Sequence, residues 1–485
     1  MADEVELKLT LRPHDAHILE ACGLLPGKPK TAQQRSVYFD TPGHRLANAG
    51  LSLRIRRSGR RRIQTVKAEG ASSAGLFARS EWESPVQDDT PIIQNSMPIF
   101  ALLGEAVAQL APVFEVHVER RIWDIRESEA RIELVLDCGE AVCGDRRSPV
   151  CELELELKHG DAAALFAFAR KLECAVPVRL GILTKADRGY ALLEPRVTVF
   201  KAERVVLTHD MMADQAFRHI VQTCLRQFRL NEDLLFERHA PEALHQARVA
   251  LRRLRSAFSI FKPLLDGDDS AGLREELGWL ATELGAARNL DVLLERAAPG
   301  PLRDRLETAH LAAYVRVEKI LASPRVRALM LNLTQWTMCG AWRGAGKTQD
   351  VRNQPAREFA TAALNHSRRK VKEDGRDLAE RDDQARHEVR KGAKKLRYAA
   401  EFFTSLFDHK RQQRRYKRFV AALEALQDQL GALNDLAMAP DVLAKLGVID
   451  EPEAAALLDS GSKKTMVDAA QEAHDALIDT KRFWS

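Results

Sequence analysis

The sequence lacks any apolar run long enough to cross a membrane, because nothing in its 485 residues approaches 18 consecutive apolar residues. Its seven cysteines form no CxxC pair and no regular framework, which argues against a disulfide scaffold and for reduced thiols packed in cores. No apolar segment of the kind that directs secretion follows residues 1–4. We therefore expect a soluble, cytoplasmic protein with no membrane partner.

A large excess of one charge is also missing. The 74 Lys and Arg residues nearly balance the 69 Asp and Glu residues, so the net charge of +5 says little about partners by itself. Residues 1–200 hold 27 basic and 28 acidic side chains, whereas the remaining residues hold 47 and 41. The basic surplus lies in the second part of a chain that is long enough for at least two cores.

Two hydrophobic patterns divide the chain. Up to about residue 190, short segments alternate apolar and polar residues as strands do, and two stretches near residues 99–110 and 162–173 have helical spacing. From about residue 208, apolar residues recur at i, i+3, i+4 and i+7. We predict an α+β domain over residues 1–200 and an all-α domain over residues 201–485.

The predicted strands carry charge along one face nearly throughout. In residues 4–9 (EVELKL) a pleated strand puts Glu4, Glu6 and Lys8 on one face, and residues 152–158 (ELELELK) repeat the pattern. A solvated face is the simpler interpretation for one strand alone. However, like charges on neighbouring strands repel, so stacking them on many strands favours a bound ligand of opposite charge.

A polyanion bound with divalent cations would account for both kinds of charge. Lys and Arg contact phosphate oxygens, while paired carboxylates hold Mg²⁺ or Mn²⁺. If the sheet closes into a barrel, both sets share one tunnel. Metal and carboxylate would then activate water against a phosphoryl group, so the residues favour a phosphohydrolase.

The opening Glu4-x-Glu6-x-Lys8 resembles the ExExK signature of the CYTH domain, also called the triphosphate tunnel metalloenzyme domain. Further residues follow in the order that the family has: YFDT at 38–41, Arg54, Arg56, Lys67, RSEWE at 79–83, Arg120, Arg121, Asp137, ELELE at 152–156, Lys185 and Arg188. The resemblance covers about residues 1–195. It implies an eight-stranded antiparallel β tunnel with flanking helices that binds triphosphate groups.

The same resemblance implies roles for individual residues. Those expected to act in catalysis are Glu4, Glu6, Lys8 and Glu154. Those expected to hold Mg²⁺ or Mn²⁺ are Glu4, Glu6, Glu81, Asp137, Glu154 and Glu156. Those expected to grip phosphate groups are Lys8, Arg54, Arg56, Lys67, Arg79, Arg121, Lys185 and Arg188. Spacing leaves open which carboxylate acts as the base.

Two basic segments in the helical part repeat each other 142 residues apart: HQARVALRRLR at 245–255 and HEVRKGAKKLR at 387–397. In each, a histidine and three cations fall at offsets 0, 3, 7 and 10, on one side of a helix. A second element, LGA followed by Asn and Asp, recurs at 284–291 and 430–435. These repeats imply two pseudo-symmetric helical bundles. Stacked cations destabilise an isolated helix, so their repetition favours a long polyanion as ligand.

These helices resemble the CHAD domain, a histidine-containing α-helical repeat, from about residue 208 to the end. The resemblance implies that the basic residues bind inorganic polyphosphate. The residues expected to do so are His245, Arg248, Arg252, Arg253, Arg255, His387, Arg390, Lys391, Lys394, Lys395 and Arg397. The two repeats together predict a basic groove for this polyanion. Further basic clusters at 368–372 and 414–418 either extend this groove or are exposed helix surface.

Together the two resemblances predict a metal-dependent inorganic triphosphatase that converts tripolyphosphate to phosphate and diphosphate, with polyphosphate, including granules, as a partner of the helical domain. The alternative is a non-catalytic polyphosphate-binding or granule-associated protein that uses both domains as phosphate-binding modules. Adenylate cyclases and thiamine triphosphatases share the barrel family, but no aromatic cluster marks a site for a base or thiazolium. Nucleic acid is disfavoured because no aromatic residues interleave with the basic helices.

Overall fold

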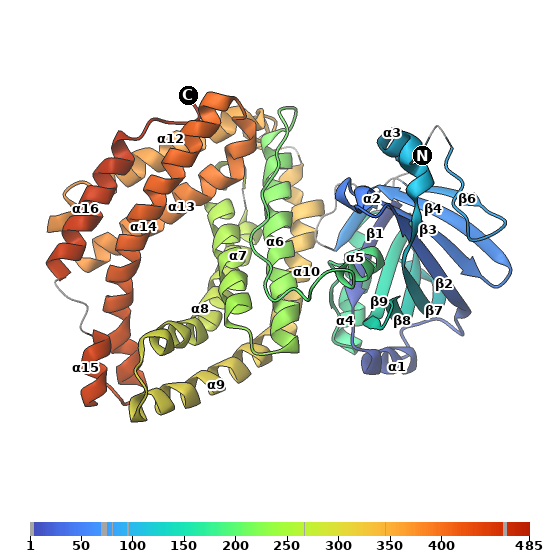
Figure 1. Cartoon of the computed structure of the whole chain (residues 1–485), viewed down its shortest axis with the longest axis horizontal. Helices are drawn as coiled ribbons and strands as arrows, with labels where there is room; N and C mark the ends of the chain where they lie inside the picture. The colour runs from blue at the N-terminus through green and yellow to red at the C-terminus, as the bar shows by residue number, and fades with distance from the viewer. Residues whose placement is uncertain are drawn as a thin grey trace. The chain divides into compact units, whose positions relative to one another are not determined.

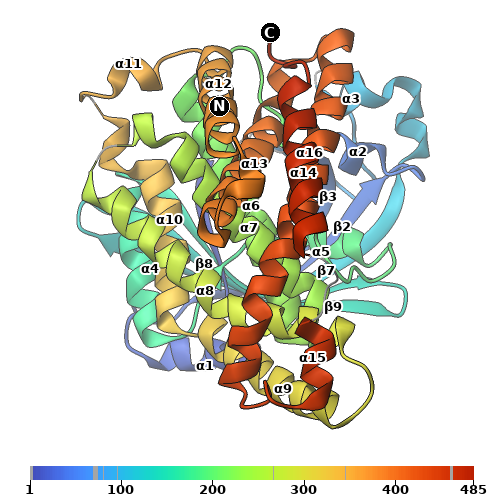
Figure 2. The ribbon, with the colours of Figure 1, turned by 90° about the vertical axis from the view of Figure 1, so that its left-hand side faces the viewer.

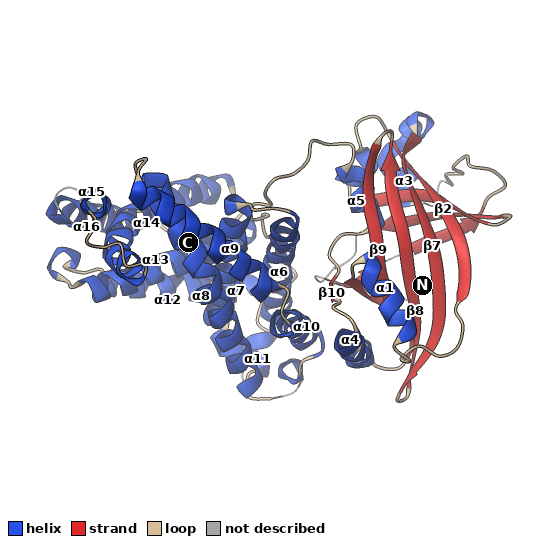
Figure 3. Ribbon diagram, turned by 90° about the horizontal axis from the view of Figure 1, so that it is seen from below, coloured by secondary structure: helices blue, strands red, loops and turns tan. Residues whose placement is uncertain are grey.

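The computed structural model describes residues 4–68, 75–79, 81–94, 97–265, 267–344, 346–458 and 463–485. The chain forms two compact units, one of Met1–Thr198 with Ser323–Cys339 and one of Val199–Ala322 with Gly340–Ser485 (Figure 1). We call the first the tunnel unit and the second the helical unit. Apart from one isolated bridge, the described residues of the helical unit contain no strand, so the predicted fold class is confirmed (Figure 3).

The tunnel unit is built on ten strands. They are β1 (Glu4–Thr10), β2 (Lys30–Asp40), β3 (Leu51–Ser58), β4 (Arg61–Ala68), β5 (Leu76–Arg79), β6 (Glu81–Pro85), β7 (Ala111–Glu127), β8 (Ala130–Cys143), β9 (Arg146–His159) and β10 (Arg179–Leu180). Its helices are α1 (Pro13–Ala21), α2 (Arg45–Asn48), α3 (Pro98–Leu103), η1 (Gly104–Gln109), α4 (Ala163–Ala175), α5 (Lys185–Ala191) and α10 (Pro324–Cys339).

The strands close into a barrel. Their order is β10-β1-β9-β8-β7-β2-β3-β4-β6, with antiparallel neighbours. β5 pairs with β1, and β6, which begins just after β5 ends, pairs with β4, so this segment joins the two ends of the order. If β5 and β6 are counted as one position in this order and the two-residue β10 is left out, the described strands fill the eight antiparallel positions that were expected.

Where helices cover the barrel, its strands turn apolar side chains outward. On β2 and β3, Phe39 and Leu53 pack in one buried cluster with Leu46 of α2 and Ile99 of α3. Helix α4 packs against β7 and β9, and its Phe166 is buried. Because side chains alternate along a strand, covering the apolar face with helices leaves the charged residues facing inward.

Helix α10 belongs to the tunnel unit although its sequence lies far along the helical part. It packs on α4 and β10. Arg170 of α4 donates to Asn332 Oδ1 at 2.8 Å, and Arg327 of α10 pairs with Glu173 of α4 at 2.9 Å. The amphipathic pattern of this segment does not distinguish it from its neighbours, so the sequence did not predict this placement.

The helical unit consists of α6 (Ala213–Glu237), α7 (Pro241–Ile260), η2 (Lys262–Leu264), α8 (Asp268–Arg296), α9 (Pro301–Leu321), η3 (Ala341–Arg343), α11 (Gln349–Arg352), α12 (Ala356–Asp374), η4 (Leu378–Glu380), α13 (Asp383–Phe403), η5 (Thr404–Leu406), α14 (Lys410–Lys445), α15 (Pro452–Leu458) and α16 (Lys463–Asp479). Helix α16 lies along α14 in two views (Figures 1 and 2). No helix in the described part of the chain is long and apolar enough to cross a membrane.

The helical unit repeats one arrangement twice. Helices α6, α7 and α8 pack in sequence, as do α12, α13 and α14, and the basic repeats lie on the middle helices, α7 and α13. These middle helices contact each other, and the distance from Arg252 Nε to the Tyr398 hydroxyl is 3.4 Å. The repeat seen in the sequence therefore brings its two copies together.

Candidate functional site

The barrel encloses a cavity of about 700 Å³ whose lining is mostly charged. The charged residues that line it are Glu6, Lys8, Arg54, Arg56, Lys67, Glu81, Glu83, Arg120, Glu133, Glu154, Glu156, Lys158, Lys185 and Asp187. Carboxylates from β1 and β9 thus share one space with guanidinium and ammonium groups from β3, β4 and β7.

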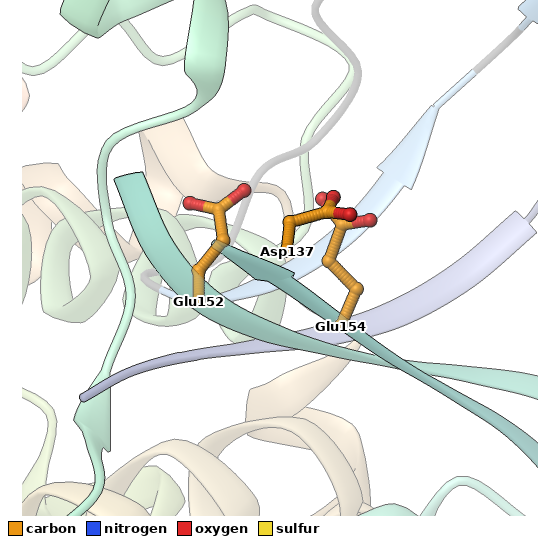
Figure 4. A group of neighbouring side chains, drawn as sticks. All are labelled: Asp137, Glu152 and Glu154. Carbon is orange, nitrogen blue, oxygen red and sulfur yellow. The ribbon is translucent and has the colours of Figure 1, made fainter. Parts of the chain in front are cut away.

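At one side of this cavity two lysines lie among three carboxylates. Asp137 of β8 and Glu152 and Glu154 of β9 have oxygens within 4.8 Å of one another, and Figure 4 shows the Asp137 and Glu154 carboxylates close together. Lys8 Nζ donates to Glu152 and Glu154 at 3.0 Å each. Lys185 Nζ contacts Glu152 at 2.6 Å, Asp137 at 2.7 Å and Glu154 at 2.8 Å. Asp137 and Glu152 are fully buried.

The ion pairs keep this network charged despite burial. Burial alone would lower the pKa of Lys185, but Asp137, Glu152 and Glu154 raise it well above its usual value. Burial alone would raise the pKa of Glu154, but Lys185, Lys8 and Arg120 hold it well below its usual range. Arg120 of β7 adds a contact of 2.8 Å to Asp137 and one of 3.0 Å to Glu154.

Two glycines make room for the lysines. A Cβ on Gly181 would lie 2.7 Å from Lys8 Cγ, and the Gly181 backbone N–H donates to the Lys8 carbonyl at 2.8 Å. A Cβ on Gly189 of α5 would lie 1.9 Å from the Phe114 ring. Without a side chain at Gly189, α5 approaches β7 closely and brings Lys185 to the carboxylates.

Local hydrogen bonds fix the start and the far end of α5. Thr184, directly before Lys185, and Asp187, two residues after it, form a reciprocal capping box with contacts of 3.0 and 2.8 Å. The Tyr190 hydroxyl donates to Asp40 Oδ2 at 2.9 Å, and Asp40 Oδ1 accepts the Leu46 N–H at 2.9 Å. Asp40, from the YFDT motif, therefore ties α5 to α2 and positions Lys185.

Glu6 differs from its carboxylate neighbours. It is the Cα partner of Glu156 in the β1–β9 ladder, and Lys8 Nζ lies 3.8 Å from it. Burial, and then the charge of Glu154, raise the pKa of Glu6. Glu6 therefore carries an unfavourable interaction that a further cation would relieve.

The opposite wall of the cavity is cationic. Burial, and then the charges of Arg54 and Arg120, lower the pKa of Arg56. Arg56 pairs with Glu83 at 3.2 Å and Lys67 pairs with Glu81 at 2.9 Å, so Glu81 lies against a lysine. Arg56, whose pKa is lowered by two neighbouring guanidinium groups, is suited to contact a multiply charged phosphate chain.

Other residues expected in the tunnel lie elsewhere or outside the described side chains. Glu4 and Arg79 are Cα partners in β1 and β5, but their side chains are outside the described part of the structure. Arg121 pairs with Glu20 of α1 at 2.8 Å and with Glu119, on the outer side of the barrel. Arg188 is on α5 but is not among the residues that line the described cavity.

Sequence reasoning omitted two members of the site, Arg120 and Glu152, from its candidates. Both could have been found from alternation, because Arg120 faces Asp137 in the β7–β8 register and Glu152 shares its face with Glu154.

The carboxylates fit a divalent metal of the Mg²⁺ class, because hard oxygen donors gather at one place. Both oxygens of Asp137 and Glu152 Oε1 already accept hydrogen bonds from lysine and arginine donors, whereas Glu152 Oε2 is buried and has no hydrogen-bond partner among the described residues. Glu6, beside Glu154, has a raised pKa that marks uncompensated negative charge. The need for a cation is therefore greatest at Glu6.

The helical unit brings together a second set of charges, Arg248 and Arg252 of α7 with Arg390 and Lys394 of α13, which we call the basic groove after the polyphosphate groove expected from the sequence. Burial, followed by the charges of Arg390 and Arg252, lowers the pKa of Lys394 to about 7. Burial, followed by Arg252 and Arg288, lowers the pKa of Arg248 to about 10. The two copies of the repeat thus place their cations within reach of each other's charge.

The LGA element of the first copy has a packing role in this groove. Arg248 Nη1 donates to the Ala281 carbonyl of α8 at 2.9 Å, and a Cβ on Gly285 would lie 2.9 Å from that nitrogen. Arg288 of the same helix acts on His245, whose pKa falls to about 4 through burial and then the Arg288 charge. Arg288 is therefore a groove cation that the repeat alone did not reveal.

Other residues of the repeats have partners outside the groove. Buried Arg253 stacks over Phe402 at 5.3 Å, and His387 Nδ1 lies 2.9 Å from Asn434 Oδ1. Arg397 pairs with Glu401 at 2.8 Å and Lys391 with Glu388 at 2.8 Å. Arg255 is exposed, and the pKa of Lys395 is lowered by burial and then by Lys370, rather than by groove residues.

The geometry defines an antiparallel tunnel with an acidic and a cationic wall, followed by a twofold helical repeat with a basic groove. The CYTH domain family matches residues 2–190 and the CHAD domain family matches residues 219–444. The chain belongs to the proteins that join a CYTH domain to a CHAD domain.

Three known proteins are similar to parts of this chain. A Haemophilus influenzae protein named inorganic triphosphatase is 29% identical over 203 residues, which cover 40% of this chain and 55%, about half, of that protein. An uncharacterised Mycobacterium tuberculosis protein is 28% identical over 418 residues, 76% of each chain. The crystal structure of the CHAD domain from the plant Ricinus communis is 30% identical and covers 58% of this chain and 93% of that one, with a TM-score of 0.47.

Proposed function

We propose that the tunnel hydrolyses inorganic triphosphate to phosphate and diphosphate, and that the basic groove binds inorganic polyphosphate. The observation that carries the first part is the single cavity in which Glu6 and Glu154 face Arg54, Arg56 and Lys67. This arrangement matches a substrate that needs cations along its length and a water-activating carboxylate at its end. The name of the Haemophilus relative supports the same chemistry, although the match spans only about half of that protein.

Glu6 and Glu154, with Glu156 as the Cα partner of Glu6, would hold Mg²⁺ or Mn²⁺. Such an ion supplies charge neutralisation on the phosphoryl oxygens and lowers the pKa of bound water. The remaining roles belong to side chains of the chain. Arg54 and Arg56, two residues apart on β3, would hold the unreactive phosphates.

Two residues would act at the reacting phosphoryl group. Lys8 lies between the carboxylate network and Glu6, so its ammonium group is placed to orient that phosphoryl group. The second is a carboxylate that accepts a proton from the attacking water. Glu6 and Glu154 lie 3.8 and 3.0 Å from Lys8 Nζ, and we assign the proton and the ion to these two carboxylates together.

The basic groove is suited to a long polyanion because its cations repel one another in the free protein. Phosphates beside Arg248, Arg252 and Lys394 would relieve that repulsion, as counter-charges do along any linear polyanion. Binding to long chains would also bring a cytoplasmic protein to polyphosphate granules. Co-sedimentation of the protein with isolated granules, lost in Arg252→Ala, tests this part.

The direct test is phosphate release from tripolyphosphate, ATP, thiamine triphosphate and long-chain polyphosphate, each with and without Mg²⁺ or Mn²⁺. The proposal expects metal-dependent release chiefly from tripolyphosphate. Release chiefly from ATP or thiamine triphosphate would replace the proposed substrate. No release from any of the four by folded protein would reduce the tunnel to a phosphate-binding module.

A further inference from the structure

Two cysteines face each other on the outer side of the barrel. Cys138 of β8 and Cys151 of β9 are Cα partners in the β8–β9 ladder, and their sulfur atoms lie 3.4 Å apart. Directly opposed residues of an antiparallel pair have Cα atoms about 4.5–5.5 Å apart, which lies within the range of about 4.4–6.8 Å that disulfides span. Both thiols are free, so a disulfide needs the sulfurs to approach by only about 1.4 Å.

The two thiols differ in access. Cys138 is partly exposed and lines a surface groove of about 770 Å³ together with Gln33, His117 and Glu119. Cys151 is buried, with 7% of its surface exposed. A small oxidant in the groove can therefore reach Cys138 first, and Cys151 lies directly behind it.

The pair is one register step from the carboxylate network. Asp137 and Glu152 are the adjacent Cα partners in the same ladder, and alternation puts them on the inner face while the cysteines lie on the outer face. Lys185 contacts these two carboxylates at 2.7 and 2.6 Å. Closing the sulfur–sulfur distance by about 1.4 Å changes the side-chain torsions of Cys138 and Cys151 and the local twist of β8 and β9. This change falls one register step from the carboxylates that contact Lys185, and hydrogen bonds weaken steeply as their geometry changes.

We propose that Cys138 and Cys151 form a redox pair in which a peroxide produces a cross-strand disulfide that slows the reaction in the tunnel. Cys138 sulfur attacks the peroxide O–O bond, which gives a sulfenic acid and one water from hydrogen peroxide. Cys151 sulfur then attacks the sulfenic sulfur, the S–S bond forms and a second water leaves. The two thiols lose two electrons, which the peroxide gains, and a dithiol reductant reverses the change.

The effect on turnover rests on the proposed function, whereas disulfide formation does not. The experiment treats the full-length chain with hydrogen peroxide at increasing ratios, maps peptides without reduction by mass spectrometry, and measures phosphate release from tripolyphosphate on the same samples. We expect a link between the peptides that carry Cys138 and Cys151. Turnover should fall at least about fivefold as the link forms and recover with dithiothreitol.

Matched variants separate the pair from other thiols. Cys138→Ser should keep its activity in peroxide, and Cys151→Ala should do the same if the serine variant folds poorly. Cys174→Ser, which changes an exposed cysteine on α4, should respond to peroxide as the unmodified chain does. Loss of activity in peroxide that persists without both Cys138 and Cys151 would contradict the proposal.

Other outcomes are equally decisive. Oxidation without the Cys138–Cys151 link would overturn the pair, and a complete link with unchanged turnover would overturn its control of the tunnel. If the reduced chain releases no phosphate, the proposed function has failed. The pair is then tested by the peptide link and by calorimetric binding of tripolyphosphate, which oxidation should weaken.

Discussion

The tunnel and the basic groove treat buried charge in opposite ways. In the tunnel, carboxylates raise the pKa of Lys8 and Lys185 against the effect of burial, so this ion-pair network is compensated before any ligand arrives, and uncompensated charge is confined to its neighbours Glu6 and Arg56. In the groove, burial and neighbouring cations lower the pKa of Arg248 and Lys394 to about 10 and about 7. A compensated network is a preorganised site for chemistry, whereas an uncompensated one gains stability when a polyanion binds.

The largest effect that would separate the two regions is expected at Glu6. Glu6→Gln keeps the size of the side chain but removes one of the two carboxylates that would hold the ion and accept the proton. We expect kcat/KM for tripolyphosphate to fall by about 10²–10⁴. Retention on immobilised polyphosphate should not change. A fall of less than threefold would remove Glu6 from the mechanism.

Compensation itself can be broken at Lys185. Lys185→Met leaves Asp137, Glu152 and Glu154 with one lysine fewer, and uncompensated buried charge of this kind costs about 3–5 kcal/mol of folding free energy. Chemical denaturation of the full chain measures the loss. Lys171→Met is the matched control, because its ion pair with Glu127 is half exposed and should contribute at most about 1 kcal/mol. Equal losses of folding free energy in both variants would show that Lys185 stabilises the fold no more than the lysine of a half-exposed ion pair does.

The groove should respond to the opposite change, the loss of a cation that lacks compensation. Arg252→Ala should weaken polyphosphate binding about tenfold and reduce the slope of log affinity against log salt by about 1. Arg397→Ala, which removes a cation paired with Glu401 and Glu424, should have a smaller effect on both. Fluorescence titration with labelled polyphosphate at several salt concentrations tests this, and the reverse ranking would place the ligand elsewhere.

The smallest effect expected is a pH dependence at Lys394. The free groove holds the pKa of Lys394 near 7, and a bound polyanion favours the ammonium form, so binding takes up a proton above neutral pH. Affinity for polyphosphate should therefore fall severalfold between pH 6 and pH 8.5. Lys394→Arg, which stays charged, should flatten the profile. The stability of the free protein changes with pH in the opposite direction. Below pH 7 the lowered pKa of Lys394 reduces the free energy of unfolding, and this reduction disappears as pH rises toward the pKa of a lysine in the unfolded chain.

Local pattern was sufficient to predict the fold and much of the site. Alternation in β1 and β9 predicted the inward face of Glu6, Lys8 and Glu154, all of which line the cavity. Arg120 and Arg121 show where this reasoning is least secure, because a shift of one residue moves a side chain to the other face of a strand. Arg120 lies opposite Asp137 in the β7–β8 pairing and faces inward, whereas Arg121 faces outward, and this register is not given by the local sequence.

Residues fixed by long-range packing could not be predicted in this way. Helix α10 has an ordinary amphipathic sequence, and its partner α4 lies more than 150 residues earlier in the chain. Arg253 and Arg397 belong to the basic repeat, but a helix with cations around much of its circumference does not show which of them face a groove. Arg253 lies over Phe402, which is distant from it in sequence, and Arg397 pairs with Glu424 of the next long helix. These partners are not visible in the repeat itself.

The central claim is that the tunnel, and not the groove, combines a metal with a phosphate chain. Crystals grown with Mn²⁺ and a non-hydrolysable triphosphate analogue would test it through the anomalous signal of manganese. The account predicts a Mn²⁺ peak beside Glu6 and Glu154, with the analogue against Lys8, Arg54 and Arg56. A tunnel without manganese, or manganese that displaces Lys185 from Asp137 and Glu152, would contradict it.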